Sequence, residues 1–227
     1  MTTVNTPADE TAARAIQDEL RGRVVLDETG PLPGKGLIAG VDVAYDDARD
    51  LVAAAAVVLD AATLDVVAES TAVGHVSFPY VPGLLAFREL PTVLAALEAL
   101  DTAPDLVVCD GYGLAHPRGF GLACHLGVVT GLPSIGVAKN PFTFTYAEPG
   151  PRRGDASPLL APDGAVVGRA LRTQDGIKPV YVSVGHRVSL DNACAQVLAL
   201  SPRFRIPEST RHADSLCRRA LREAVAG

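Results

Sequence analysis

Apolar and polar positions change their spacing along this chain, and the first third has the spacing of strands. Residues 36–45, 51–60 and 64–74 are runs of mostly apolar side chains, and runs of this length without helical spacing are typical of strands. Only three residues, 61–63, separate the last two runs, which predicts a hairpin between them. We therefore predict that the sheet begins with three antiparallel strands.

After residue 80 the spacing becomes helical, and helices alternate with short apolar runs. The pattern predicts helices over residues 6–21, 83–100, 119–131, 190–201 and 208–226. It predicts further strands over residues 105–110, 133–140, 165–173 and 178–189. Three strands followed by alternating helices and strands indicate one α/β domain over residues 1–227, with a mixed central β-sheet flanked by helices.

Three local features refine these predictions. Thr6 followed by Pro7 predicts the start of the first helix. Pro91 is expected to break or kink the second helix, because proline removes a backbone donor and clashes with the preceding turn. Residues 145–164 are rich in Pro, Gly and Asp, which predicts a long surface loop.

Length and composition restrict the class of protein. The 227 residues are 48% hydrophobic, enough for one sizeable core. No apolar run approaches the roughly 20 residues of a membrane helix, and the acidic N-terminal segment lacks the apolar core of a signal peptide. We expect a soluble, cytoplasmic protein without a membrane partner. The four cysteines, with no Cys-x-x-Cys pair, argue against zinc and disulfide frameworks and predict buried free thiols.

The net charge of −6 hides an uneven distribution. It argues against a strongly basic, non-specific nucleic-acid binder. Residues 111–153, however, carry one acid, Glu148, against four basic residues, and residues 203–222 carry six arginines against two acids. Either segment could contact phosphates; ordinary solvated surface is the alternative.

Carboxylates stand at unusual positions in several predicted elements. Asp42 lies inside an apolar strand, where a charge is costly unless it is paired or bound to a metal. Asp110 ends a buried strand, where α/β sheets form their functional clefts; it could instead cap the next turn. Glu89 shares a helix face with Leu85, although a surface glutamate shielded by Arg88 fits equally. With Asp214 of the last helix, these residues suggest a magnesium site for phosphoryl chemistry.

Six segments between about residues 38 and 214 resemble the endonuclease V family. They occur in the order "GVDVAY", "FPYVPGLLAFRELP", "DGYGLAHPRGFGLACHLG", "GVAKN", "KPVYVSVGHRVSL" and "RIPESTRHAD". The resemblance implies a ribonuclease H-like fold. It also implies a repair endonuclease that hydrolyses the second phosphodiester bond 3′ to deoxyinosine and leaves 3′-hydroxyl and 5′-phosphate ends. The implied cofactor is Mg²⁺, with Mn²⁺ expected to substitute.

The resemblance also assigns catalytic roles. The aspartate of "GVDV", the glutamate of "AFRE" and the aspartate after "VVC" match the family's magnesium-binding carboxylates, here Asp42, Glu89 and Asp110. Asp42 and Asp110 would be the principal ligands, with Glu89 assisting an in-line attack by water. Lys139 of "GVAKN" would either neutralise charge at the scissile phosphate or hold the attacking water, and Asp214 would lie near the metal.

Further residues are expected to contact nucleic acid. "FPYVPG" resembles the family's wedge, in which Tyr80 would stack where a base has been extruded and Pro79 and Pro82 would stiffen the loop. Around the base and phosphates we expect Gly83, Leu85, Gly111, Gly113, His116, Arg118 and Gly121. Tyr112 departs from the family, where a smaller or more polar residue is usual.

Several alternatives stay open at this stage. The expected partner is DNA that contains deoxyinosine, but inosine-containing single-stranded RNA is another possible substrate. A protein that binds inosine strands without cutting them is a second alternative, which the presence of all three carboxylates opposes. A small-molecule metal phosphatase is a third, which the wedge opposes. Nothing in the sequence resembles a dimerisation seam, so we expect a monomer.

Overall fold

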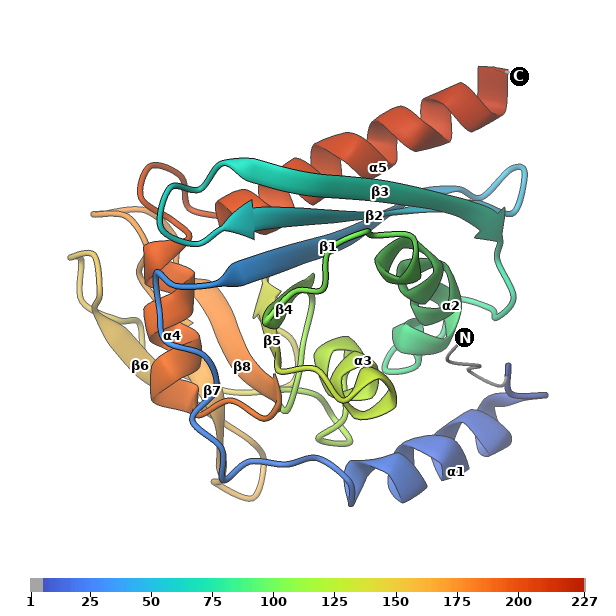
Figure 1. Cartoon of the computed structure of the whole chain (residues 1–227). Coiled ribbons are helices and arrows are strands. Elements are labelled where there is room, and N and C mark those ends of the chain that lie inside the picture. The colour runs from blue at the N-terminus through green and yellow to red at the C-terminus, as the bar shows by residue number, and fades with distance from the viewer. Residues whose placement is uncertain (1–5, 227) are drawn as a thin grey trace.

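A single mixed sheet of eight strands forms the centre of the protein (Figure 1). The computed structural model describes residues 6–226. The N-terminal segment, in which we expect no signal peptide, begins with residues 1–5, and these lie outside the described residues. The strands are β1 (Leu37–Asp46), β2 (Leu51–Asp60), β3 (Val66–His75), β4 (Leu106–Asp110), β5 (Ser134–Ala138), β6 (Ala156–Leu160), β7 (Val166–Leu171) and β8 (Val180–His186). Their order across the sheet is β3-β2-β1-β4-β5-β8-β7-β6.

Within residues 6–226 the chain forms five helices, which pack in layers around the sheet (Figure 1). They are α1 (Glu10–Arg21), α2 (Leu85–Glu98), α3 (Leu122–Thr130), α4 (Leu190–Ala199) and α5 (Glu208–Ala226). Side chains of α2 and α3 share one apolar cluster with β1, β2 and β4, whereas α4 and α5 pack on the opposite face. The helix α1 packs outside α2 and α3. The α/β class with a mixed sheet flanked by helices is therefore confirmed.

The first three strands form the predicted antiparallel meander. The apolar run of β2 is buried along nearly its whole length, because α2 covers one of its faces and α5 the other. In contrast, β3 is the edge strand, and its side chains alternate between exposed and half-buried positions. The continuous apolar pattern of β2 thus indicates a strand buried on both faces, and the alternating burial of β3 indicates a strand with one face exposed.

Two sequence predictions about local structure are wrong. Residues 145–164 are not a continuous loop, because β6 lies within them and pairs with β7. It is an edge strand, where Pro158 is tolerated because one side of the strand needs no donor. The first helix begins at Glu10 rather than beside Thr6, since the side chain of Asp9 accepts a hydrogen bond from the backbone N–H of Ala12.

Other local predictions are confirmed. The final helix spans the predicted residues 208–226, and Gly131 ends α3 in the left-handed conformation. Pro91, in contrast, lies within α2 without breaking it, because the helix continues to Glu98. All four cysteines are buried and free.

The sheet opens where β4 ends. β1 and β4 run parallel, and their pairing extends only from Ile38 to Val41 of β1. β1 continues for five more residues to Asp46, and this part has no strand partner on the β4 side. The opening therefore exposes the carboxyl-terminal ends of neighbouring parallel strands, where α/β proteins place their ligands.

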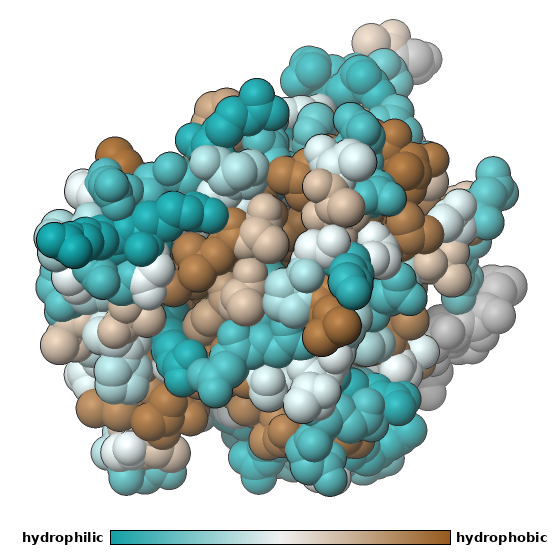
Figure 2. Space-filling view, turned by 60° about the vertical axis from the view of Figure 1, so that its left-hand side comes forward, coloured by the Kyte–Doolittle hydropathy of each residue, from teal (hydrophilic) through white to brown (hydrophobic). Residues whose placement is uncertain are grey.

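The surface shows no single dominant apolar face in the view of Figure 2, where apolar patches alternate with hydrophilic side chains. Within residues 6–226 no helix is both long and apolar enough to cross a membrane.

Candidate functional site at the opening of the sheet

Three charged side chains converge at the opening. Asp42 lies on β1, Asp110 is the last residue of β4, and Lys139 directly follows β5. The Nζ atom of Lys139 forms an ion pair with Asp110 and lies 4.0 Å from Oδ2 of Asp42. β1, β4 and β5 are parallel neighbours, so residues at their carboxyl-terminal ends meet at one edge of the sheet.

Asp42 is a mostly buried carboxylate, with 11% of its side chain exposed, and one of its oxygens has no hydrogen-bond partner. Its Oδ1 atom accepts a hydrogen bond of 2.8 Å from the backbone N–H of Val43, whereas its Oδ2 atom has no hydrogen-bond partner. Burial, and then the charge of Asp110, raise the pKa of Asp42 to about 8. A buried carboxylate in this state is stabilised by a nearby cation.

Glu89 enters the same site from α2. Only 6% of its surface is exposed, so it is not the surface glutamate considered as an alternative. The hydroxyl of Tyr45 donates a hydrogen bond of 3.1 Å to its Oε1 atom. Burial raises the pKa of Glu89 to about 7, although the bond from Tyr45 opposes this shift. Arg88 forms its ion pair with Asp47 and lies over the Tyr45 ring at 4.6 Å.

Asp214 lies at the margin of the site. Its negative charge raises the pKa values of both Asp42 and Lys139. Its own carboxylate is paired with Arg218 on the next turn of α5 at 2.9 Å. Asp214 therefore acts on the site through its charge, while its own carboxylate is paired with Arg218.

The donor chemistry of the site fits a hard divalent cation. Among residues 6–226 no group of three or more His, Cys, Asp or Glu side chains stands in metal-binding geometry. The three carboxylates nevertheless offer only oxygen donors, which Mg²⁺ and Mn²⁺ prefer. The unpartnered Oδ2 atom of Asp42 and the ammonium group of Lys139 between Asp42 and Asp110 both mark a position that favours positive charge.

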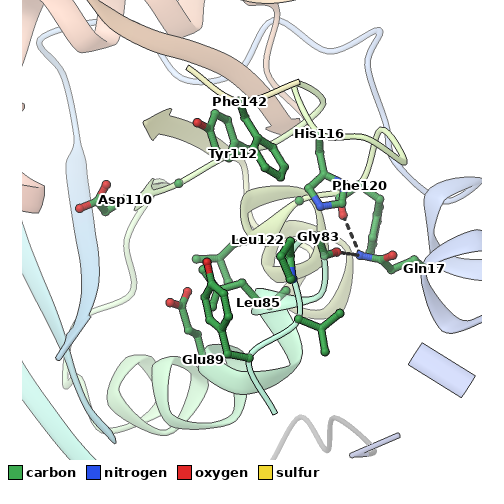
Figure 3. A pocket seen from close by; sticks show the side chains of 16 residues that line it. Gln17, Gly83, Leu85, Glu89, Asp110, Tyr112, His116, Phe120, Leu122 and Phe142 are labelled. Carbon is green, nitrogen blue, oxygen red and sulfur yellow. Dashed lines mark hydrogen bonds between the residues drawn. The ribbon is translucent and has the colours of Figure 1, made fainter. Parts of the chain in front are cut away.

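A pocket of about 250 Å³ adjoins the carboxylates (Figure 3). Asp110 and Glu89 lie at one end, and His116 and Gln17 lie at the other (Figure 3). Its volume falls just below the range of about 300–1,000 Å³ that is usual for drug-sized ligands. The pocket therefore suits a small planar group rather than a whole nucleotide.

Two interactions hold the far end of the pocket in shape. The Nε2 atom of Gln17 donates hydrogen bonds to the carbonyl oxygens of Gly83 at 2.9 Å and Phe120 at 3.3 Å. This side chain ties α1 to the two loops that border the pocket.

Burial lowers the pKa of His116 to about 4, so the imidazole on the pocket wall is neutral near pH 7.

The "FPYVPG" segment forms the rim of the pocket. Tyr80 is 69% exposed and, within the described residues, makes no ring contact, which leaves its face available for stacking. Gly83 adopts φ +84°, a conformation that favours glycine. Pro82, Gly83 and Leu85 line the pocket with Tyr80, whereas Pro79 is exposed and does not.

The remaining predicted contacts divide into two groups. Gly111, Gly121 and His116 line the pocket. Gly113 does not, and its lack of a side chain has a packing explanation, because a Cβ there would lie 2.0 Å from the carbonyl oxygen of Val184 on β8. Arg118 lies beside a neighbouring groove and forms an ion pair with Asp18.

Sequence reasoning missed three residues of the site. Gln17 and Phe142 line the pocket, and Tyr45 holds Glu89. Gln17 could have been noticed, because it lies between Ala13 and Leu20 on the buried face of α1. Phe142 stacks on Tyr112 with ring centroids 5.5 Å apart, and no spacing rule connects these two rings.

Comparison with known proteins now decides the family. A sequence profile described as endonuclease V matches residues 18–215. The chain belongs to the endonuclease V family. It is 74% identical to endonuclease V of Streptomyces avermitilis over 231 residues, which cover 100% of both chains.

Solved structures of endonuclease V have the same fold. The crystal structure of the Streptomyces avermitilis protein is similar with a TM-score of 0.95 and 75% identity, covering 97% of this chain and 96% of that one. An endonuclease V from Ciona intestinalis, in complex with a 24-mer DNA containing an inosine followed by a ribo-adenosine, is similar with a TM-score of 0.82 and 27% identity. That match covers 95% of this chain and 100% of the Ciona chain. The predicted ribonuclease H-like fold is thereby confirmed.

Proposed function

We propose that this protein is a Mg²⁺-dependent endonuclease that hydrolyses the second phosphodiester bond 3′ to deoxyinosine in DNA. The products are a 3′-hydroxyl and a 5′-phosphate. One observation carries the proposal: Asp110 and Glu89 lie at one end of a pocket of base size, and Lys139 links Asp110 to Asp42, whose buried Oδ2 atom has no hydrogen-bond partner. The inosine-containing DNA bound by the Ciona relative supports inosine as the recognised base.

Base recognition would rely on the backbone and on stacking. Hypoxanthine carries a 6-oxo group and an N1–H, which backbone groups of the pocket wall would pair with, and Gly83, Gly111 and Gly121 would let the base approach that wall closely. These glycines line the pocket and add no side-chain bulk. Tyr80 on the rim would fill the space that the extruded base leaves in the stack.

The chain's own residues would then organise the hydrolysis. Asp42 and Asp110 would hold the divalent ion, with Glu89 beside them and kept in orientation by Tyr45. When bound, Mg²⁺ supplies Lewis acidity toward the scissile phosphate, and Mn²⁺ is expected to substitute. Lys139, which pairs with Asp110 here, would move to the phosphate and neutralise its developing charge. Asp214 would contribute only through its charge.

The layout also supports an offset between the recognised base and the nick. The pocket holds the base at one end, and the carboxylates stand at the other (Figure 3). A strand whose base enters the pocket would therefore present a more distant phosphate to Asp42 and Asp110. Cleavage beyond the first 3′ bond fits this separation.

The test is a 5′-labelled duplex with one deoxyinosine, incubated with wild type or Asp110→Ala in Mg²⁺ or EDTA. We expect a nick at the second 3′ bond that requires Mg²⁺ and disappears in the variant. Tight binding without a nick would replace the proposal with a non-cleaving inosine-binding protein.

An inosine-specific ribonuclease is the second candidate. The ribo-adenosine that follows inosine in the DNA bound by the Ciona relative favours it. Matched single-stranded DNA and RNA oligonucleotides with one inosine separate the two substrates. A larger kcat/KM for RNA would establish RNA as the preferred substrate.

We further propose that the whole chain, residues 1–227, acts as one domain and as a cytoplasmic monomer. Light scattering of the purified protein tests the monomer directly, and a mass twice that of the 23.6 kDa chain would contradict it.

A further inference from the structure

A groove extends away from the carboxylates between β1 and α5. Two adjoining hollows of about 400 Å³ and 480 Å³ form it. One wall consists of residues 43–47, and the other of Arg218, Leu221, Arg222 and Val225 on α5. The wall from β1 is the part of the strand that has lost its β4 partner. α5 extends beyond the sheet on this side (Figure 1). We call this feature the β1–α5 groove.

Tyr45 connects the groove to the proposed active site. This residue lines both hollows, and its hydroxyl donates a hydrogen bond to Glu89. Glu89 in turn lines the base pocket with Asp110. The groove therefore adjoins the carboxylates through Tyr45, and none of the residues that line it also lines the base pocket.

This arrangement fixes a direction for the bound strand. If the base enters the pocket and the nick falls on its 3′ side, nucleotides further toward the 3′ end lie beyond the carboxylates. The β1–α5 groove adjoins the carboxylates without sharing a residue with the base pocket, so it offers these nucleotides a surface. The groove would bind the part of the cleaved strand that begins with the new 5′-phosphate.

The charges of the groove fit a phosphate backbone. Its acidic residues are already paired: Asp46 with Arg49 at 2.8 Å and Asp47 with Arg88. Arg222 is exposed and forms no ion pair within residues 6–226, so its guanidinium group is available to a ligand. The neighbouring Leu221 and Val225 add apolar surface, which suits sugars and bases.

We propose that the β1–α5 groove binds the DNA strand on the 3′ side of the cleaved bond, with Arg222 contacting a backbone phosphate. This inference rests on the proposed function, because the position of the nick sets the direction of the strand. It adds a second binding surface, which shares no lining residue with the base pocket.

The test compares affinities without cleavage, in EDTA, by fluorescence anisotropy. Two single-stranded oligonucleotides with one deoxyinosine carry about two or about ten nucleotides beyond the nick, which bracket the length of a short single-strand site. The proteins are wild type, Arg222→Ala and Arg222→Glu. Arg219→Ala is the matched control, because Arg219 is an exposed arginine of the same helix that pairs with Glu69 of β3 at 3.3 Å.

We expect Arg222→Ala to weaken binding of the long oligonucleotide by about 3–10-fold and to lower the slope of log affinity against log salt by about 0.7. Arg222→Glu should weaken it further, whereas the short oligonucleotide and the Arg219→Ala control should show wild-type affinities. Equal losses for both lengths, or no loss for either, would overturn the proposal. Cleavage at inosine by the wild type is scored separately, so failure of the groove and failure of the proposed function remain distinguishable.

Discussion

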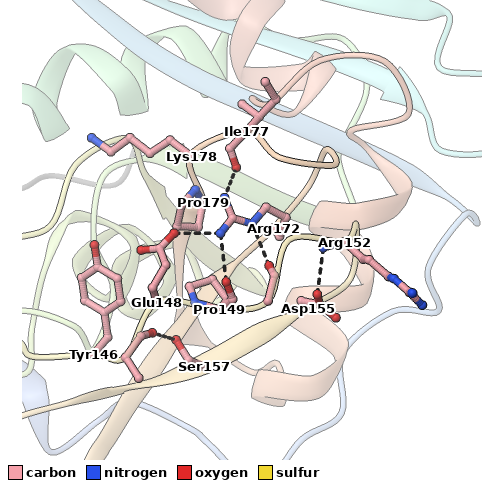
Figure 4. Close-up of polar contacts among 12 residues, drawn as sticks. Tyr146, Glu148, Pro149, Arg152, Asp155, Ser157, Arg172, Ile177, Lys178 and Pro179 are labelled. Atoms are coloured by element: carbon pink, nitrogen blue, oxygen red, sulfur yellow. Dashed lines mark hydrogen bonds and ion pairs between the residues drawn. The ribbon is translucent and has the colours of Figure 1, made fainter.

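The carboxylate site and the segment around Arg172 both hold charged side chains away from solvent, but they satisfy those charges differently. Arg172 is only 6% exposed and donates hydrogen bonds to the carbonyl oxygens of Gly150, Pro149 and Ile177 (Figure 4). Its Nη2 atom also pairs with Glu148 at 2.7 Å. In contrast, Asp42 keeps one buried oxygen without a partner.

Two further arginines are satisfied in the same way as Arg172. Arg153 donates to the carbonyl oxygens of Ser201 and Leu198, both at 2.6 Å. Arg205 donates to those of Lys139 at 2.5 Å and of Lys178 and Pro179 at 2.9 Å. Arg153 and Arg205 belong to the two basic segments that suggested phosphate contacts, and their donors are instead used inside the protein.

The difference separates structural charge from functional charge. A buried ionic group whose hydrogen bonds are all made stabilises one conformation. A buried group that lacks a partner destabilises the protein until a ligand provides one. A variant at the carboxylate site should therefore lose activity without losing stability, whereas a variant at Arg172 should lose stability and keep its activity.

The largest effect is expected at Asp42. Asp42→Asn should reduce cleavage by about 10³-fold or more, equivalent to about 4 kcal/mol, because it removes a charge that the cation needs. In EDTA the same variant should be more stable than wild type. The folded pKa of about 8 lies above the ordinary 3.8, so the wild type loses stability as pH rises from about 4 to about 8, and the neutral asparagine does not.

Thermal unfolding in EDTA measures this gain. The gain should grow as the pH rises from about 4 toward 8 and be on the order of a few kcal/mol at pH 8. Asp101→Asn, on an exposed residue, is the control and should match wild type at every pH. A variant at Asp42 that is less stable than wild type at pH 8 in EDTA would contradict the unsatisfied state of this carboxylate.

The opposite result is expected at Arg172. Arg172→Met should lower the free energy of unfolding by about 3 kcal/mol, because it leaves several buried acceptors without donors. Cleavage per folded molecule should stay within about 3-fold of wild type, a difference below about 0.7 kcal/mol. Urea unfolding and single-turnover cleavage measure the two quantities. Arg152→Met replaces an exposed arginine nearby and should change neither; a loss of cleavage in folded Arg172→Met would remove the distinction between the two regions.

A smaller effect is expected at Tyr45, which supports the carboxylate site through Glu89 but is not one of its carboxylates. Tyr45→Phe removes the hydroxyl that orients Glu89 and keeps the ring beneath Arg88. Groups that orient metal ligands typically account for about 10–100-fold in affinity, and we expect the lower end. Calorimetric titration with Mn²⁺ measures this loss, with Tyr80→Phe as a control that removes a hydroxyl outside the carboxylate set. Unchanged Mn²⁺ affinity in Tyr45→Phe would show that Glu89 needs no such support.

The sequence predicted the fold where a local pattern decides the structure. β2 and α5 follow their apolar spacing over the predicted residues 51–60 and 208–226. β6 escaped prediction because its few residues lie among prolines and glycines, and only pairing with β7 makes them a strand. The start of α1 was misplaced because Thr6 and Asp9 are both good capping residues.

The site was predictable where a residue conflicts with its own surroundings. Asp42 inside an apolar strand and Asp110 at the end of another are visible in the sequence, and the structure brings them together through Lys139. The roles of Tyr45 and Arg205 were not visible, because their partners lie far away along the chain. Contacts of this kind depend on the register of the sheet, which no local pattern specifies.

The most direct test is a crystal structure with Mn²⁺, in which anomalous scattering locates the ion. The oxygen of Asp42 that lacks a hydrogen-bond partner, beside Asp110, predicts a peak within about 2 Å of oxygens of both residues, with the Nζ atom of Lys139 displaced from its ion pair with Asp110. A peak at another site, or Lys139 still bound to Asp110 at saturating Mn²⁺, would contradict the claim that these carboxylates hold the metal.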